Sequence, residues 1–319
     1  MLQIDQRQLG ASAIVVPALG VGTWSWGDKS VWGYGQEYTR DDVMQAYQAC
    51  LAAGLNFFDT AEVYGSGMSE RLLGECQRAN GRPILIATKF APYPRRFSAR
   101  ALLTALDQSL ERLGVQSVDL YQIHFPYSLL SIHALMDAMA EAVRSGKVRA
   151  VGVSNYSAEQ MRKAHARLAR HHIPLASNQV HYSLLHRAPE ANGVLAACRD
   201  LDVALIAYSP LEQGLLTGKF RPQNGQYPPV AGARRFFSGF RKSQRQKMEP
   251  LLQTLAQIAQ VHDKTSAQVA LNWLLAKDEH IIPIPGAKNV RQATENAGAL
   301  SWRLTDAEQD QIEQAARSL

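Results

Sequence analysis

The chain has 319 residues, of which 46% are hydrophobic and 19% charged, so it can bury a large core and global disorder is not expected. The formal net charge of +6 is too small an excess to indicate a nucleic-acid partner by itself. Runs of about 18 apolar residues and a basic-then-apolar start are both missing from the sequence, which argues against a membrane span and a secretory signal.

The 3 cysteines, Cys50, Cys76 and Cys198, are far apart and odd in number. Their spacing fits neither a disulfide framework nor a metal site, so no metal is expected and the cytoplasm is the predicted location.

Short apolar runs separated by amphipathic segments recur along the chain. Such runs are typical of parallel strands that are buried on both faces. The predicted strands are Ala18–Val21, Leu55–Phe58, Ile84–Thr88, Val118–Ile123, Ala150–Val153, Ala176–Val180, Val203–Ala207 and Ile281–Ile284.

Helical patterns lie between these strands. Capping residues support them: Gly54 and Gly114 follow the segments 41–53 and 98–113, and Ser98 and Ser157 open the segments 98–113 and 157–170. The predicted helices cover residues 41–53, 98–113, 131–145, 157–170 and 266–276.

Eight strand-helix units predict an α/β fold, a (β/α)8 TIM barrel formed by residues 1–319 as a single domain. A doubly wound sheet is the alternative, but the glycine-rich turn that it would want after the first strand is missing from the sequence. Residues 2–17 are expected to form a hairpin that caps the bottom of the barrel. Residues 217–247 are expected to form a long loop over its mouth.

Polar side chains stand where the predicted strands end. Asp59, Lys89 and His124 follow three consecutive strands, and Tyr64 lies just beyond Asp59. In a barrel these strand ends share one face, where the chemistry is done. A buried lysine needs a carboxylate partner, so Asp59 and Lys89 are expected to pair.

These four residues form a candidate acid-base site. A nearby ammonium stabilises a phenolate, so Lys89 is expected to lower the pKa of Tyr64. His124 could bond the same substrate oxygen. The alternative for Asp59 and Lys89 is a structural ion pair that closes the barrel, and for His124 a barrel-mouth histidine with satisfied hydrogen bonds.

The sequence resembles the aldo-keto reductase superfamily over almost its whole length. It is most similar to the bacterial and plant branch with general-stress and pyridoxal-reductase-like members, which also includes potassium-channel β subunits. The resemblance rests on LGVGTW (19–24), FFDTAEVYG (57–65), IATKF (86–90), DLYQIHFP (119–126), VGVSNY (151–156), SNQVHYSL (177–184), AYSPLEQGLLTGK (207–219) and IPIPGAKNVRQATENAGAL (282–300).

The resemblance implies a catalytic tetrad of Asp59, Tyr64, Lys89 and His124. Tyr64 would be the general acid in carbonyl reduction, and Lys89, held by Asp59, would tune it. His124 would orient the carbonyl, and hydride would come from NADPH. This is the function expected: reduction of aldehydes and ketones to alcohols with the NADPH/NADP+ couple.

The resemblance also implies the cofactor site. Tyr208 would stack on the nicotinamide, and Ser154, Asn155 and Gln179 would hold its carboxamide. The pyrophosphate would lie under the loop 209–217. The expected cofactor residues are Gly22, Thr23, Trp24, Asp59, Ser154, Asn155, Gln179, Tyr208, Ser209, Pro210, Leu211, Gln213, Gly214, Leu216, Gly218, Lys219, Pro285, Gly286, Ala287, Lys288, Gln292, Glu295 and Asn296.

The adenine end departs from the better-known vertebrate members of the family. They carry Lys-Ser where this chain has Gly286-Ala287, and Arg where it has Gln292. The positive charge has moved to Lys288, with Arg291 as a helper, so Lys288 is expected to pair with the 2′-phosphate and favour NADPH over NADH. The alternative for Lys288 is a solvated lysine at a helix start.

Aromatic residues are expected to line the substrate pocket, which suggests an apolar or aromatic aldehyde. The basic segment 234–247 is interpreted either as a solvated loop or as an anion site, and the latter would favour a phosphorylated aldehyde. The expected pocket residues are Trp24, Trp26, Trp32, Tyr93 and Phe125, with Phe236 and Phe237 as further candidates.

Two other functions are compatible with a lysine at a strand end of a barrel that binds NADPH. A Schiff-base aldolase would use Lys89 as a nucleophile, and Asp59 argues against it. An NADPH-binding regulatory or redox-sensing partner subunit would turn over slowly. The predicted partners are a small carbonyl substrate and no nucleic acid or membrane, with the protein a monomer or weak homo-oligomer.

Overall fold

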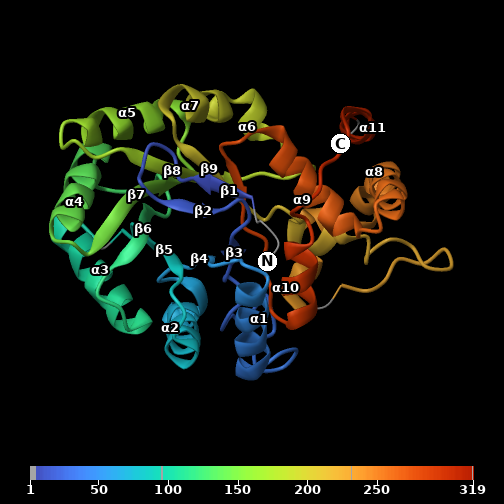
Figure 1. The fold of residues 1–319 in the computed structure, drawn as a ribbon, viewed down its shortest axis with the longest axis horizontal. Coiled ribbons are helices and arrows are strands. Elements are labelled where there is room, and N and C mark those ends of the chain that lie inside the picture. Colours follow the sequence, from blue (N-terminus) through green and yellow to red (C-terminus); the bar gives the residue numbers. More distant parts are fainter. Residues whose placement is uncertain (1–4, 95, 231, 318) are drawn as a thin grey trace.

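The structure is a computed structural model that describes residues 5–94, 96–230, 232–317 and 319. Its centre is an 8-stranded parallel sheet in which every strand pairs with its neighbours in chain order (Figure 1). The strands are β3 (Val21–Gly22), β4 (Phe57–Asp59), β5 (Leu85–Phe90), β6 (Val118–Ile123), β7 (Val148–Ser154), β8 (Leu175–His181), β9 (Ala204–Tyr208) and β10 (Ile281–Pro283).

The sheet curls until its first and last strands meet. The amide of Gly20 donates to the carbonyl of Pro283 at 2.9 Å, and the amide of Gly22 donates to that of Pro285 at 3.1 Å. The predicted (β/α)8 barrel is therefore confirmed, with all eight predicted strands in place.

Helices surround the sheet (Figure 1). The five predicted helices are α1, α3, α4, α5 and α9, and capping boxes at Thr39, Ser157 and Thr265 explain where three of them begin. The helices are α1 (Arg40–Ala52), α2 (Met68–Asn80), α3 (Ala99–Leu113), α4 (Ile132–Arg144), α5 (Ala158–Ala169), α6 (Ala188–Ala191), α7 (Val194–Leu201), α8 (Lys242–Val261), α9 (Ser266–Lys277), α10 (Val290–Ala297) and α11 (Asp306–Ala316).

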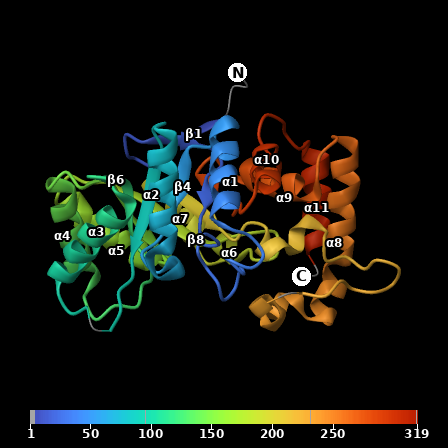
Figure 2. The same cartoon turned by 90° about the horizontal axis from the view of Figure 1, so that it is seen from below.

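The predicted hairpin closes the bottom of the barrel, at the end that carries the N-terminus in Figure 2. Strands β1 (Gln6–Gln8) and β2 (Val15–Pro17) pair antiparallel. Arg7 of β1 donates to the carbonyls of Asp278 at 2.7 Å and Leu275 at 2.5 Å, so the hairpin is tied to the end of α9. Residues 2–4 of the predicted stretch lie outside the described residues.

The interpretation of residues 217–247 as one loop was wrong at its C-terminal end, because α8 begins at Lys242. Three short 3-10 turns lie at its start and before α8: η2 (Glu212–Thr217), η3 (Gly232–Phe236) and η4 (Ser238–Phe240), while residues 218–230 contain no helix and no strand of the sheet. Arg234 in η3 is only 8% exposed, so the basic segment is not simply a solvated surface.

The interior of the barrel changes from apolar to polar along its axis. Phe57, Ala87 and Leu120 belong to a buried apolar cluster inside the sheet. Side chains two positions further along a strand face the same way. Asp59, Lys89 and Gln122 therefore face inward above this cluster, and the polar layer is the floor of the barrel mouth.

Among the helices of the described residues, none combines the length and the apolar character that crossing a membrane requires.

Candidate active site

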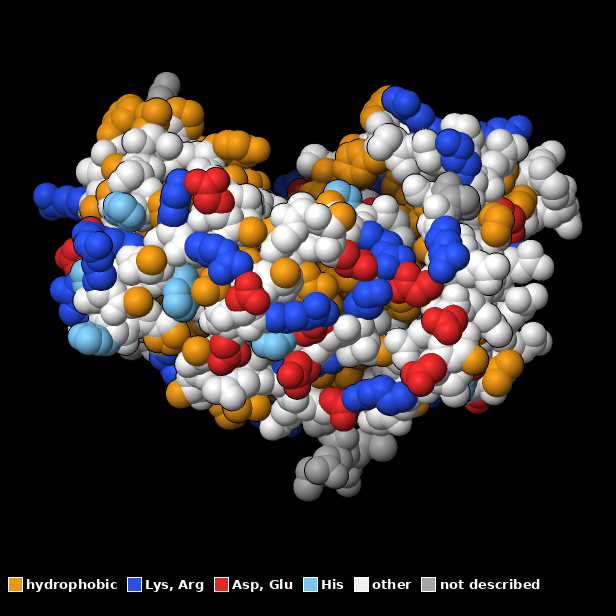
Figure 3. Space-filling view, turned by 90° about the horizontal axis from the view of Figure 1, so that it is seen from above, with side chains coloured by type: hydrophobic (Ala, Val, Ile, Leu, Met, Phe, Trp, Pro, Cys, Tyr) orange, Lys and Arg blue, Asp and Glu red, His pale blue; other side chains and the backbone are white. Residues whose placement is uncertain are grey.

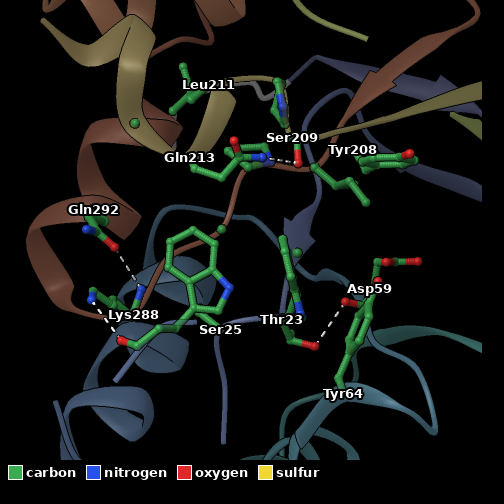
Figure 4. A pocket seen from close by; sticks show the side chains of 18 of the residues that line it. Thr23, Ser25, Asp59, Tyr64, Tyr208, Ser209, Leu211, Gln213, Lys288 and Gln292 are labelled. Atoms are coloured by element: carbon green, nitrogen blue, oxygen red, sulfur yellow. Dashed lines mark hydrogen bonds between the residues drawn. The ribbon is translucent and has the colours of Figure 1, made fainter. Parts of the chain in front are cut away.

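A cavity of about 570 Å³ opens at the carboxyl ends of the strands. Figure 3 shows the molecule hollowed between two raised rims, and Figure 4 shows side chains from both sides of the barrel pointing into the space. Most residues expected from the sequence line it: Gly22, Thr23, Trp24, Trp32, Asp59, Tyr64, His124, Phe125, Ser154, Asn155, Gln179, Tyr208, Ser209, Pro210, Leu211, Gln213, Gly214, Lys219, Pro285, Gly286, Lys288, Gln292, Glu295 and Asn296.

The four residues of the expected tetrad lie together. Lys89 Nζ is 2.5 Å from Asp59 Oδ1 and 3.2 Å from the Tyr64 hydroxyl. The rings of Tyr64 and His124 meet edge to face with centroids 5.7 Å apart. Lys89 is 0% exposed and lies beneath the cavity, so it reaches the cavity only through Tyr64.

Burial governs the pKa of Tyr64. Desolvation raises it above its usual value of 10.0, while the charge of Lys89 lowers it. Lys89 thus lowers the pKa of Tyr64 as expected, but burial outweighs this effect, so the expectation of a net lowered pKa was wrong for this structure. The pKa of Lys89 is itself raised: burial lowers it, but the Asp59 carboxylate and the Tyr64 phenol outweigh that effect. Lys89 therefore stays charged and Tyr64 stays protonated at neutral pH.

Two amides that face Asp59 complete its environment. Gln122 Nε2 donates to Asp59 Oδ2 at 3.0 Å, and Gln179 Nε2 donates to the same oxygen at 2.8 Å. Together with Lys89 these donors satisfy both oxygens of the buried carboxylate and fix its orientation. Gln122 was missed from the sequence, although its place two residues before His124 on an inward-facing strand was a usable signal.

The loop that carries Tyr64 is held from outside the cavity. Glu62 accepts from the amide of Ala91 at 2.6 Å and pairs with Arg96, which contacts both of its carboxylate oxygens. Gly65 has a φ of +55°, and a β-carbon there would meet the carbonyl oxygen of Gly27 at 2.8 Å. Glu62 and Arg96 therefore fix the turn that aims Tyr64, a role that no sequence pattern indicated.

His124 is neutral in this site. Burial, helped by the charge of Lys89, lowers its pKa from 6.5 to about 2. Its Nδ1 is buried and has no hydrogen-bond partner among the described residues. That leaves Nε2 as the nitrogen available to a ligand, and a neutral ring can donate its one N–H there.

One end of the cavity offers flat and amide-like surfaces. The hydroxyl of Tyr208 donates to Asn155 Oδ1 at 3.1 Å, and Asn155 Nδ2 donates to Ser154 Oγ at 3.0 Å. Gln179 lies beside them, because its carbonyl accepts from the amide of Asn155 at 2.8 Å and from Ser154 Oγ at 2.9 Å. An aromatic face surrounded by donors and acceptors suits a planar ring with a carboxamide.

The opposite end is cationic. Lys219, Arg234 and Lys288 all line the cavity, and the charges of Arg234 and Lys288, added to burial, lower the pKa of Lys219. Arg234 Nε is buried with no partner among the described residues. Lys288 Nζ pairs with Glu37 Oε2 at 2.9 Å. Neither Arg234 nor Glu37 was singled out as a cofactor residue from the sequence.

Some expected residues lie away from the cavity. Trp26 is fully buried and its indole donates to the carbonyl of Ala287 at 2.8 Å, so it supports the wall from behind. Tyr93 and Phe236 are 52% and 73% exposed on the rim. The residues expected at the site that the structure does not place on the cavity surface are Trp26, Tyr93, Lys89, Leu216, Gly218, Ala287, Phe236 and Phe237.

The donor set fits the dinucleotide that the resemblance implies. A buried guanidinium whose Nε has no hydrogen-bond partner among the described residues, with two lysines nearby, suits an anion such as a phosphate group. Gly214 has a φ of +96°, so the loop after β9 can turn its backbone toward such a group. Hydroxyl and amide groups at the other end match a carboxamide.

Comparisons with known proteins agree with this geometry. A model described as the aldo/keto reductase family matches residues 18–317. The chain is 41% identical to a chloroplastic pyridoxal reductase of Arabidopsis thaliana, covering 95% of this chain and 84% of that protein. It is 32% identical to the L-glyceraldehyde 3-phosphate reductase of Escherichia coli, covering 94% and 88%.

Solved structures show the same fold. A glycerol dehydrogenase of Gluconobacter oxydans superimposes with a TM-score of 0.85 at 27% identity, covering 99% of this chain and 96% of the other. An aldo-keto reductase of Klebsiella pneumoniae in complex with NADPH gives 0.77 at 26% identity, covering 98% and 95%.

Proposed function

The chain belongs to the aldo/keto reductase family, and from that premise we propose that it is an NADPH-dependent oxidoreductase that reduces aldehydes and ketones to alcohols. The observation that carries the proposal is the placement of a protonated phenol, Tyr64, 3.2 Å from a fully buried ammonium, Lys89, at the floor of the cavity.

The tetrad supplies the proton of the reaction. When bound, the cofactor supplies hydride to the carbonyl carbon. Tyr64 donates its hydroxyl proton to the carbonyl oxygen, and Lys89 stabilises the phenolate as it forms. The Nε2–H of His124 donates to the same oxygen and orients it. Asp59, held by Gln122 and Gln179, keeps Lys89 charged in a site that would otherwise favour the neutral amine.

The cationic end supports NADPH as the cofactor. Lys288, Arg234 and Lys219 would hold the phosphates, and Tyr208, Asn155 and Gln179 would hold the nicotinamide. The Klebsiella pneumoniae relative was solved with NADPH, which agrees with this choice.

An aromatic aldehyde without a phosphate group is the proposed substrate class. Trp24, Val63 and Phe125 line the cavity, and the rings of Phe125 and His124 are stacked with centroids 4.2 Å apart. Lys288 lies on the opposite side of the cavity from Tyr64 (Figure 4), so the cationic cluster is placed for the cofactor rather than for a phosphorylated substrate. Pyridoxal, named for the Arabidopsis thaliana relative, is the first compound to test.

Replacing Tyr64 by Phe tests the proposal, because it removes one oxygen atom and leaves the ring. We expect Tyr64→Phe to bind NADPH as the wild type does and to lower kcat for pyridoxal reduction by about 10²–10⁴-fold. NADPH consumption measures kcat, and quenching of tryptophan fluorescence measures binding. Retention of full activity by the variant would show that Tyr64 is not the general acid.

Two alternatives receive less support. A Schiff-base aldolase needs a neutral Lys89, but Asp59 holds its ammonium at 2.5 Å and its pKa is raised. A regulatory partner subunit would share the cofactor site, and a kcat that stays very low for every carbonyl tested would favour it.

Three further proposals rest on the sequence. Residues 1–319 are proposed to form a single domain, the protein is proposed to be a monomer or a weak homo-oligomer without nucleic-acid or membrane partners, and its location is proposed to be the cytoplasm. Size-exclusion chromatography with light scattering tests the oligomeric state.

A further inference from the structure

The loop after β9 has an unusual backbone. Ser209, Glu212 and Gln213 have φ angles of 51°, 48° and 50°, although none of them is glycine. Residues with a β-carbon avoid this left-handed region, so three of them within five positions persist only where surrounding contacts hold them. The same loop lines the cavity through Ser209, Pro210, Leu211, Gln213 and Gly214.

Glu212 provides such contacts and turns its side chain away from the cavity. Its Oε1 accepts from His181 Nε2 at 2.6 Å and from Ser183 Oγ at 2.5 Å. The residue is only 9% exposed and is not among those that line the cavity. It therefore ties the strained loop to the end of β8.

His181 links Glu212 to the ring of Tyr208. The two residues are paired in the registers of β8 and β9, and their rings are nearly parallel, with an interplanar angle of 12° and centroids 5.3 Å apart. His186 stacks on His181 with centroids 4.0 Å apart. The position of the Tyr208 ring thus depends on a histidine that is itself fixed by Glu212.

We propose that Glu212 and His181 are positioning residues for the cofactor: together they hold the loop 209–217 and the Tyr208 ring in the arrangement that receives the dinucleotide. The inference rests on the proposed function. A loop that is already ordered does not lose conformational entropy when the ligand binds, so affinity rises without any new contact. Since neither residue touches Tyr64, Lys89 or His124, the effect belongs to binding rather than to the proton transfer.

The test measures the dissociation constant of NADPH by fluorescence titration, and kcat for pyridoxal at saturating NADPH. We expect Glu212→Ala and His181→Ala to raise Kd about tenfold, with kcat changed by less than about threefold. His181→Phe keeps a flat ring beside Tyr208 and is expected to recover part of the affinity.

Glu212→Gly separates the contacts from the strain, because glycine adopts a φ of 48° freely. This variant can adopt the native loop conformation without strain but loses the hydrogen bonds to His181 and Ser183. Its Kd for NADPH is therefore expected to rise as in Glu212→Ala. The matched control is Glu308→Ala, since Glu308 accepts from His262 Nε2 at the same distance of 2.6 Å between α11 and α8. Its Kd is expected to equal that of the wild type.

An unchanged Kd in both Glu212 variants would overturn the inference, and so would an equal rise in the Glu308→Ala control. Failure of the proposed function has a different signature: either the wild type does not bind NADPH, or Tyr64→Phe keeps its activity. The two failures are therefore told apart within one set of measurements.

Discussion

Lys288 illustrates how a single charge could choose between two cofactors. It lines the cavity and its ammonium is held by Glu37, whose pKa it lowers through their hydrogen bond. The pair places the ammonium of Lys288 beside a carboxylate at the cavity wall, where an anion of a ligand could take the place of Glu37. A 2′-phosphate would compete with Glu37 for it, and NADH, which has no such group, would not.

Replacing Lys288 by Gln should therefore weaken NADPH selectively. A charge-assisted hydrogen bond contributes about 1.5–3 kcal/mol, so Kd for NADPH should rise about 10- to 100-fold. Kd for NADH should change by less than about threefold, and the two titrations are each other's control. An equal loss of affinity for NADPH and NADH would show that Lys288 does not bind the 2′-phosphate.

His124 should make the fold sensitive to acid. Burial lowers its pKa to about 2 in the folded protein, against 6.5 for an exposed histidine. Below about pH 6.5 His124 binds a proton in the unfolded chain but not in the folded chain. Its contribution to the free energy of unfolding is therefore fully present above that pH and is lost as the pH falls. Between about pH 7 and pH 5 this group should lower the free energy of unfolding by about 2 kcal/mol.

Urea unfolding at the two pH values, compared between wild type and His124→Phe, measures that contribution. The variant keeps a ring in the site but has no group to protonate, so its loss of stability on acidification should be smaller by about 2 kcal/mol. If wild type and variant lose the same amount, the histidine is not held neutral.

The sequence predicted the tetrad because strand ends can be read from short apolar runs. Asp59, Lys89 and His124 each follow such a run. Gln122 could have been found in this way, from its place two residues before His124. Glu62 and Arg234 could not, since ions in loops resemble surface residues until the chain folds. The pKa of Tyr64 also depended on burial, which a list of neighbouring charges does not contain.

Among the elements, α2 is anchored by a buried carboxylate. Glu70 is 0% exposed, and it accepts from Thr88 Oγ1 of β5 and from Arg112 Nε of α3, each at 2.6 Å. Thr88 precedes Lys89 in β5. The contacts of Glu70 therefore join α2 and α3 to the strand that carries Lys89.

Breaking this contact from the arginine side should be costly. Arg112→Met leaves the Glu70 carboxylate buried without its partner, and such changes cost about 3–5 kcal/mol. Chemical denaturation measures the loss. The control is Lys163→Met on α5, which breaks an exposed pair with Glu159 and should cost far less stability than Arg112→Met. A similar small loss in both variants would mean that Glu70 is protonated or hydrated.

Elements with strong patterns were the ones predicted from sequence. Strands bounded by polar loops and helices with capping residues were placed within a few residues. Helix α8 was not predicted, because Lys242–Lys247 is basic and polar and Pro250 inside the helix argues against one. Tertiary packing of Met248, Leu251 and Leu255 outweighs that local signal.

At the scale of the whole molecule, the cavity draws on the entire chain. Its lining runs from Gly22 on β3 to Asn296 on α10, with residues in or after β4, β6, β7, β8 and β9 between them. The buried core also extends from Ala18 to Ala316. A ligand in this cavity therefore touches both halves of the barrel at once.

Thermal unfolding should show whether a ligand in the cavity stabilises both halves of the barrel together. A ligand that binds only the folded state at about 100 times its Kd stabilises it by about 2.7 kcal/mol, which for a chain of this size raises Tm by about 4 °C. If residues 1–319 are one domain, calorimetry should show a single transition, and NADPH should move all of it. Two independent units would instead give two transitions, of which only the unit that binds the nucleotide would shift. Glu308→Ala, which lowers stability away from the cavity, should lower Tm but leave the shift caused by NADPH unchanged.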